Sequence, residues 1–199
     1  FGGGLQWNHR GTATIQGAIS AAVRAEFTDG TVGAAAGGLV SITALTGVLT
    51  MGRLDLSAAA NAGFGAPSVA TGGRLEIGTI AGTQFNINGG AVFNAEALGS
   101  TGSGGVAGGD GQGGSIRIAN AGIMRLTMGD SSLAMVVDGT GGDSSGGQAG
   151  VGRGGSIQVT NEAGGRLSMT TTAFQVGASA RGRGGDSSNG GVGGGAAGG

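Results

Sequence analysis

A pair of glycines followed by two apolar residues at positions i and i+2 recurs along the chain. The pairs are Gly37-Gly38, Gly72-Gly73, Gly113-Gly114 and Gly154-Gly155, and a degraded copy begins at Gly2-Gly3. From one copy to the next, the position of the first glycine therefore rises by 35, 35, 41 and 41. A period of this length is the signature of a repeat protein, in which each unit packs only on its neighbours. We therefore divide the chain, 1–199, into five repeats of a single solenoid: 2–36, 37–71, 72–112, 113–153 and 154–197.

Within each repeat, apolar residues alternate with polar or small ones. This is the period of a β-strand and not of a helix. Ser115-Ile116-Arg117-Ile118 and Ser156-Ile157-Gln158-Val159 are two examples. The pattern predicts three short strands per repeat, each with one buried face. The expected core positions are Val40, Ile42, Leu49, Met51, Leu75, Ile77, Phe85, Ile87, Ile116, Ile118, Leu126, Met128, Leu133, Ile157, Val159, Leu167, Met169 and Phe174.

Equivalent apolar residues in successive repeats favour an all-β fold, a parallel β-helix (β-solenoid) whose coils stack roughly 4.8 Å apart. A sandwich of short strands is the alternative, but it does not require similar inward pairs once in every repeat. Segments 113–137 and 154–178 align without a gap, which predicts that Leu126 stacks on Leu167 and Arg125 on Arg166. Val92 is expected to face inward in the third strand, unless a local slip turns Phe93 inward instead.

Glycine is concentrated in three segments, 99–114, 138–155 and 182–199, and accounts for 52 of the 199 residues. Each segment precedes a Gly-Gly pair, so we expect Gly-rich excursions at one corner of the coil. Two interpretations stay open for them. Glycine lets backbones approach closely, which allows a second ordered layer of extended segments. Gly/Ser-rich chain is also typical of flexible loops.

The residue types needed for most catalytic chemistry are scarce. The chain has no Cys, Lys or Tyr, and His9 is its only histidine. The acidic residues do not share one repeat position, as a carboxylate pair for glycoside hydrolysis would. We therefore expect no enzyme and no cofactor, and single out Asp138 and Asp143 as candidate Ca²⁺ ligands. A short arginine row that includes Arg53 can hold an anionic polysaccharide or pair with carboxylates of a neighbouring molecule.

Charge and hydropathy exclude two further classes. The net charge is −1 and no basic run occurs, so a nucleic-acid footprint is absent. No apolar stretch approaches the roughly 18 residues that span a membrane as a helix, so we expect no transmembrane helix. The chain begins at Phe1, and Gly198-Gly199 fall where a sixth repeat would open, so we expect a segment of a longer array.

The Gly-Gly-Ser-Ile motifs at 113–116 and 154–157, each preceded by a Gly-rich tract and followed by a Leu-x-Met strand, resemble the repeats of bacterial large exoproteins. These are the filamentous-haemagglutinin-like and autotransporter-type adhesins. The resemblance covers about residues 37–199 and, less closely, 1–36. It implies a secreted right-handed β-helix that forms fibres on the bacterial cell surface, with roles in adhesion, biofilm or coats. It carries over no catalytic residue.

These observations predict an extracellular structural or adhesive β-solenoid that forms a fibre or surface filament. The open ends of a solenoid carry unpaired backbone groups, so self-association, end to end or lateral, is expected. Surface glycans are a further class of partner. One alternative is a carbohydrate-binding or polysaccharide-cleaving β-helix. Another is a phage-type receptor-binding tip whose Gly-rich loops form the contact surface.

Overall fold

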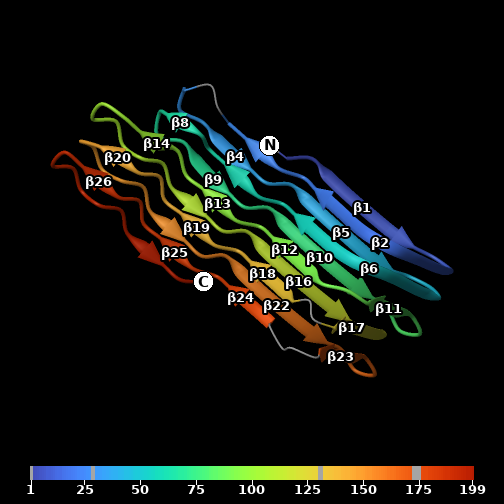
Figure 1. The fold of residues 1–199 in the computed structure, drawn as a ribbon. Helices are drawn as coiled ribbons and strands as arrows, with labels where there is room; N and C mark the ends of the chain where they lie inside the picture. Colours follow the sequence, from blue (N-terminus) through green and yellow to red (C-terminus); the bar gives the residue numbers. More distant parts are fainter. Residues whose placement is uncertain (1, 28–29, 130–131, 172–175) are drawn as a thin grey trace.

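The computed structural model describes residues 2–27, 30–129, 132–171 and 176–199. The described residues form β-strands and turns, and every pairing between strands is parallel. The protein is an all-β parallel solenoid, in which successive repeats form successive coils of one stack (Figure 1). Within this described part, the chain has no helix that is long and apolar enough to span a membrane.

Sheet A contains the strands that follow the Gly-Gly pairs. Its strands, in stacking order, are β1 (Gly4–His9), β5 (Leu39–Ala44), β10 (Arg74–Thr79), β16 (Ser115–Asn120) and β22 (Ser156–Asn161). The register pairs Leu5, Val40, Leu75, Ile116 and Ile157 in one inward row. The positions along this row rise by 35, 35, 41 and 41, as the Gly-Gly spacing predicts.

Each coil is broad at one end, which we call the wide end, and sheet B closes that end. Its strands are β2 (Thr12–Ala22), β6 (Val48–Ser57), β11 (Gln84–Ile87), β12 (Ala91–Asn94), β17 (Ile123–Gly129), β18 (Leu133–Val136), β23 (Arg166–Thr171) and β24 (Val176–Ser179). The long strand β6 pairs with β11 along its first half and with β12 along its second, so one strand of the second coil corresponds to two in the third.

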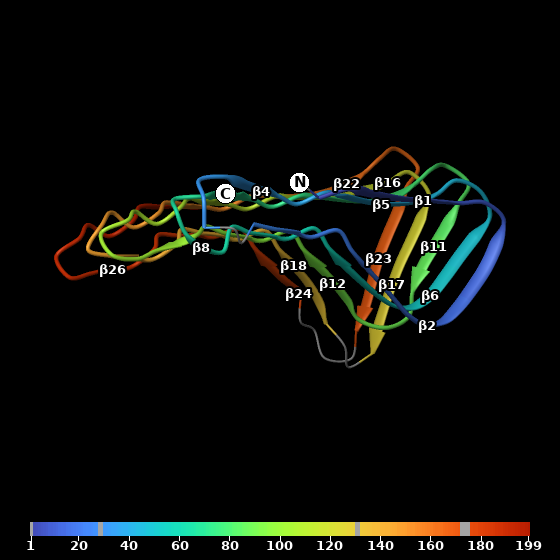
Figure 2. The same cartoon turned by 90° about the horizontal axis from the view of Figure 1, so that it is seen from above.

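The Gly-rich tracts form three more sheets. Sheet C contains β3 (Ala25–Glu26), β7 (Ala60–Asn61), β13 (Ala97–Leu98), β19 (Gly139–Thr140) and β25 (Gly182–Arg183). Sheet E contains β8 (Phe64–Gly65), β14 (Thr101–Gly102), β20 (Ser144–Ser145) and β26 (Ser187–Ser188). Sheet D contains β4 (Ala34–Ala36), β9 (Val69–Thr71), β15 (Gly111–Gln112), β21 (Gly152–Arg153) and β27 (Ala196–Ala197). Figure 2 shows that these strands extend the wide end into a thin, two-layered projection, which we call the glycine blade.

The blade is ordered, which decides between the two interpretations of the Gly-rich tracts. Its two layers are joined by backbone hydrogen bonds that cross the interior. Gly109 N donates to Ser100 O, Gly142 N to Gly109 O, and Gly150 N to Gly142 O, each at 2.8 Å. Along the stack, the successive donors of this ladder come from one layer and then the other. A Cβ atom at Gly141 would overlap the Gly150 carbonyl of the opposite layer, so only glycine allows this separation of the layers.

A second ladder explains the repeated Gly-Gly pair. The N–H of its second glycine crosses the interior and donates to a carbonyl of the opposite wall. Gly73 N reaches Ala58 O at 2.6 Å, Gly114 N reaches Ala95 O at 2.8 Å, and Gly155 N reaches Val137 O at 2.7 Å. The two walls therefore meet here, and the ladder separates the apolar core of the wide end from the blade.

The core lies between sheets A and B in the second, third and fourth coils. The expected core side chains of these coils, from Val40 to Leu133, are buried. Those of the last coil, Ile157, Leu167 and Met169, are only partly buried, and Val159 is 43% exposed, because no coil covers them from the other side. Phe174 lies outside the described residues.

The gapless alignment of the last two repeats is wrong in sheet B. Leu126 pairs with Met169, not with Leu167, and Arg125 pairs with Ser168, not with Arg166. The turn after sheet A is two residues longer in the last coil, which changes the offset between paired positions from 41 in sheet A to 43 in sheet B. Met124 is consequently a core residue that the alignment did not identify.

The third strand of the coil contains the expected slip. Phe93 is buried and pairs with Leu56 and Met135, whereas Val92 pairs with Asp55 on the outer face. Leu133 stacks on Ala91 and, on its other side, on Val176.

Candidate functional site

The outer face of sheet A has a shallow hollow over β5, β10 and β16. Ser41, Thr43 and Glu76 line it, together with Arg117 from the fourth coil. Gly78 forms its floor, because the position has no side chain between its neighbours Thr43 and Ala119. Glu76 forms an ion pair with Arg74 on the same strand. The hollow offers hydroxyls and two carboxylates, those of Glu76 and Glu162, and Arg74 already neutralises the first of them.

A second hollow lies where sheet B continues into sheet C. Arg24, Glu26, Asn94 and Glu96 are among the residues that line it. Asn94 forms two hydrogen bonds with Glu96. Its Nδ2 donates to Glu96 Oε2 at 2.5 Å, and its Oδ1 accepts from Glu96 N at 2.9 Å. This hollow is polar and shallow, and the Glu96 carboxylate in it already has a partner.

The two candidate calcium ligands each bond to the next coil. The Asp138 carboxylate accepts hydrogen bonds from Ser179 Oγ at 2.6 Å and from Arg181 N at 2.7 Å. Asp143 Oδ1 accepts from Asp186 N at 2.8 Å. The described residues bring no three His, Asp or Glu side chains into a group that could hold a metal ion. These aspartates satisfy backbone N–H groups of the neighbouring coil instead of those of their own turn.

We expect millimolar Ca²⁺, or a chelator in its place, to leave the midpoint of thermal unfolding unchanged. The carboxylates of Asp138 and Asp143 already accept hydrogen bonds that a cation would have to replace. Circular dichroism melts with Ca²⁺, with Mg²⁺ and with chelator test this. A rise of several degrees with Ca²⁺ alone would contradict it, since a ligand that binds only the folded state raises the midpoint.

His9, the only histidine, belongs to the first coil. Its side chain is 8% exposed, and Nε2 lies 2.9 Å from Gly11 O. Its ring meets that of Trp7 edge to face, with centroids 6.2 Å apart. No carboxylate or hydroxyl is among these partners, so the arrangement gives His9 a packing role at the end of the core.

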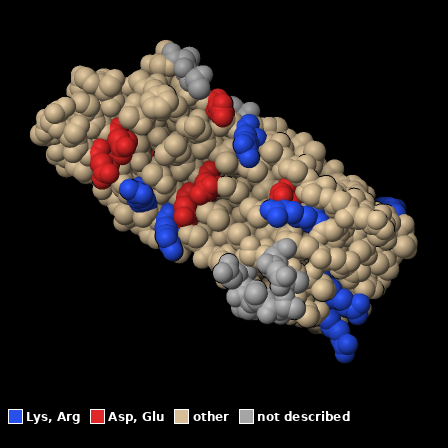
Figure 3. All heavy atoms as spheres, in the orientation of Figure 1, with Lys and Arg blue, Asp and Glu red and all other residues tan. Residues whose placement is uncertain are grey.

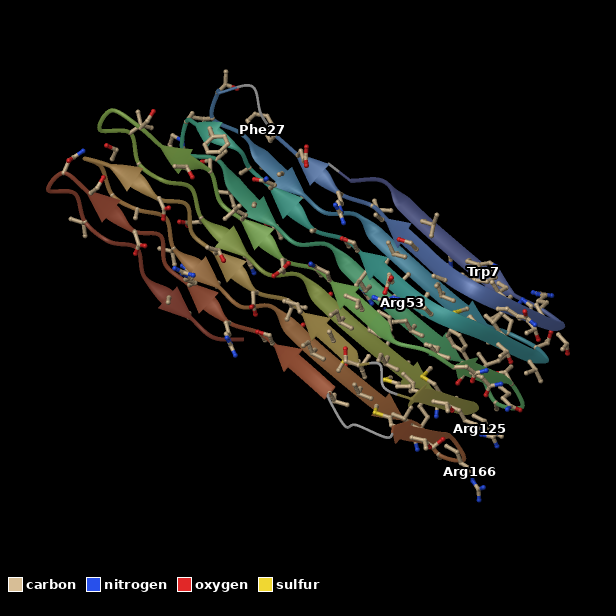
Figure 4. All side chains as sticks on the ribbon, in the orientation of Figure 1. Trp7, Phe27, Arg53, Arg125 and Arg166 are labelled. Atoms are coloured by element: carbon tan, nitrogen blue, oxygen red, sulfur yellow. The ribbon has the colours of Figure 1, made fainter. Side chains whose placement is uncertain are left out.

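The expected arginine row does not form. Figure 4 shows Arg53, on β6 of the second coil, apart from Arg125 and Arg166 of the last two coils. Arg53 Nε donates to Asp55 Oδ2 at 2.8 Å, and this hydrogen bond, together with the charge of Asp55, raises the pKa of Arg53. On the face seen in Figure 3, acidic and basic residues are interspersed among neutral ones. That face therefore offers no concentrated charge to an anionic polymer.

The two outermost coils of the stack have strand edges that are unpaired among the described residues. The first coil presents one edge of β1 and β2, and the last coil presents one edge of β22 and β23. Inward-facing side chains are uncovered at both ends: Leu5 is 43% exposed on the first coil, and Val159 is 43% exposed on the last. The sequence predicted open ends, but not which side chains they expose.

No match to a known protein emerges from comparisons with family models, curated proteins and solved structures. The regular stack of coils and the glycine blade are the most distinctive features of the chain's own geometry.

Proposed function

We propose that this chain is an extracellular structural protein that works as a segment of a β-solenoid fibre, with adhesion as a property of the fibre surface. The observation that carries the proposal is the regular stack itself: sheet A pairs five coils in one continuous parallel register, and such a stack can be extended by further coils. The outer strand edges of a stack carry backbone groups that can pair with another coil.

The shape of the coil also favours a structural role. The blade widens each coil by means of backbone hydrogen bonds and close glycine contacts, with few large side chains. It therefore enlarges the outer surface without a matching apolar core. In each hollow one carboxylate already has a partner, Glu76 with Arg74 and Glu96 with Asn94. Interspersed charges suit a surface that is solvated and not specialised for one charged ligand.

Electron microscopy of the purified chain at neutral pH tests the proposal. We expect filaments whose diffraction has an axial repeat of roughly 4.8 Å, the spacing of stacked strands. Discrete particles of one chain at every concentration tested would overturn the fibre proposal. A glycan array on the same material separates the alternative: saturable binding to one polysaccharide by discrete particles would instead support a carbohydrate-binding module.

A further inference from the structure

We propose that Asn88 is a site of spontaneous deamidation in the folded chain, and that the isoaspartate formed there loosens the contact between the second and third coils. Asn88 follows β11 and is joined directly to Gly89, in the corner that leads to β12. The modification needs only water as a co-reactant. It goes beyond the proposed fibre function and does not depend on it.

The reaction is an intramolecular displacement at the side-chain amide of Asn88. The backbone nitrogen of Gly89 loses its proton and bonds to Cγ of Asn88, while the Cγ–Nδ2 bond breaks and the amide group leaves with a proton as ammonia. Both groups belong to adjacent residues, so the step is unimolecular. Water then opens the resulting succinimide ring. Attack at one ring carbonyl gives aspartate, and attack at the other gives isoaspartate, in which the main chain runs through the former side chain.

The packing of the two coils requires glycine at position 89. A Cβ atom at Gly89 would overlap the carbonyl oxygen of Gly52, which is a backbone atom of the preceding coil. Any other residue would therefore push the third coil away from the second. Glycine is also the residue that hinders ring closure least, because it has no Cβ to shield its nitrogen and its backbone is the most adaptable. The fold thus fixes the residue that makes Asn88 reactive.

The two groups that react are accessible to each other and to water. The Asn88 side chain is exposed. Within the part of the chain that the structure describes, neither the Asn88 side-chain amide nor the Gly89 N–H has a hydrogen-bond partner. The Asn88 N–H, which takes no part in the reaction, donates to Met51 O at 2.8 Å. Ring closure therefore sacrifices no hydrogen bond of the groups that react, and water reaches the ring once it has formed.

Asn86, two residues earlier on β11, is the comparison within the same strand. Its Nδ2 donates to Thr50 Oγ1 at 3.0 Å, and its Oδ1 accepts from Gln84 Nε2 at 3.0 Å. The residue that follows it, Ile87, is β-branched and buried in the core. Deamidation of Asn86 would break both side-chain hydrogen bonds and move a core residue. The fold therefore protects Asn86 and leaves Asn88 open to reaction.

The isoaspartate product alters the main chain between two points at which the third coil is held to the second. Asn88 N donates to Met51 O at 2.8 Å, and Gly90 O accepts from Leu54 N at 3.2 Å. Isoaspartate adds one carbon atom to the main chain between these two hydrogen bonds. No side-chain rotation can take up this added length, so the corner must move away from the second coil and weaken them. Aspartate leaves the main chain unaltered and adds only a negative charge.

Peptide mapping by mass spectrometry tests the modification. The chain carries Asn189→Gln, so that Asn88 is its only asparagine followed by glycine, and is incubated folded in mildly alkaline buffer. We expect Asn88 to convert progressively to aspartate and isoaspartate, which electron-transfer fragmentation distinguishes, while Asn86 stays intact. The same chain unfolded in urea gives the reference rate. Conversion of Asn88 in urea but not in the folded chain would overturn the proposal, because the fold would then protect this site as well.

Asn88→Asp separates the added charge from the altered main chain. This variant has the side chain of the aspartate product on an ordinary backbone, and because that side chain is exposed it should melt like the parent. The isoaspartate form, isolated chromatographically from aged protein, should melt several degrees lower. An isoaspartate form that melts like Asn88→Asp would overturn the predicted loosening of the coils. Neither failure bears on the fibre, which electron microscopy tests separately.

Discussion

Gly142→Ala is expected to destabilise the folded chain by about 4 kcal/mol. Its Cβ would overlap the carbonyl oxygen of Ser100, which is a backbone atom that no rotamer change can move. Ser100 holds the same position one coil earlier in the same layer, so the backbone at Gly142 must shift, and two cross-layer hydrogen bonds at 2.8 Å are lost, from Gly142 N to Gly109 O and from Gly150 N to Gly142 O. Each buried polar group left without a partner costs about 1 to 3 kcal/mol. Urea denaturation of variant and parent measures the loss.

Gly78→Ala is the matched control. Gly78 also lies in the middle of the stack, on the outer face of β10, but a Cβ there meets its nearest neighbours only at 3.6 Å, which is ordinary van der Waals contact. Because glycine weakens a strand by about 0.5 to 1 kcal/mol relative to alanine, this substitution should leave stability unchanged or raise it slightly. Equal destabilisation by the two substitutions would show that the blade does not depend on the close backbone approach at Gly142.

Asn120→Ala is expected to cost about 3 kcal/mol. Asn120 is fully buried at the end of β16, in a ladder that runs along the stack. Its Oδ1 accepts from Thr79 Oγ1 at 2.6 Å, and its Nδ2 donates to Asn161 Oδ1 at 2.6 Å. Removing the amide leaves the Thr79 hydroxyl without its acceptor in a site that excludes water, and also creates a cavity.

Asn161→Ala provides the comparison for this second prediction. Asn161 occupies the same position one coil later, but it is exposed on the last coil and its Nδ2 donates to Gly165 O. Asn161 Oδ1 also accepts from Asn120 Nδ2, but truncating the exposed Asn161 opens that donor to water. Water can then replace the lost partners, so a cost under about 1 kcal/mol is expected. The difference between the two alanine variants, measured by urea denaturation, isolates the effect of burial. No difference between them would show that the buried ladder contributes little.

The sequence was sufficient to predict sheet A, because the Gly-Gly pairs mark where each of its strands begins. Sheet B was harder for a physical reason. Alternation with period two is unchanged by a two-residue shift, whereas a one-residue shift turns every side chain to the other face. Two extra residues follow Asn161 in the last coil, so the alternation of Leu167 and Met169 also fitted the wrong register. Met124 was therefore not identified as a core residue.

The blade and the end faces were predictable only in part. The tract Gly141-Gly142-Asp143-Ser144-Ser145 is repeated at 184–188, which indicated equivalent positions in neighbouring coils. It gave no sign of the contact between layers, because a glycine that faces another backbone reads the same as one in a loop. The sequence also did not distinguish a metal-binding role from a structural role for Asp138 and Asp143. Their partners include backbone N–H groups of the next coil, which the sequence pattern does not reveal.

The blade has a thermodynamic consequence. Unfolding exposes apolar surface, which raises the heat capacity, and polar surface, which lowers it. Between the layers of the blade, much of the buried surface is peptide backbone, as the contacts of Gly109, Gly142 and Gly150 illustrate. Its unfolding therefore adds less to the heat capacity than that of an ordinary core. A smaller heat capacity change flattens the dependence of stability on temperature, so this half of each coil loses less of its stability on cooling than the wide end, where hydrophobic burial weakens.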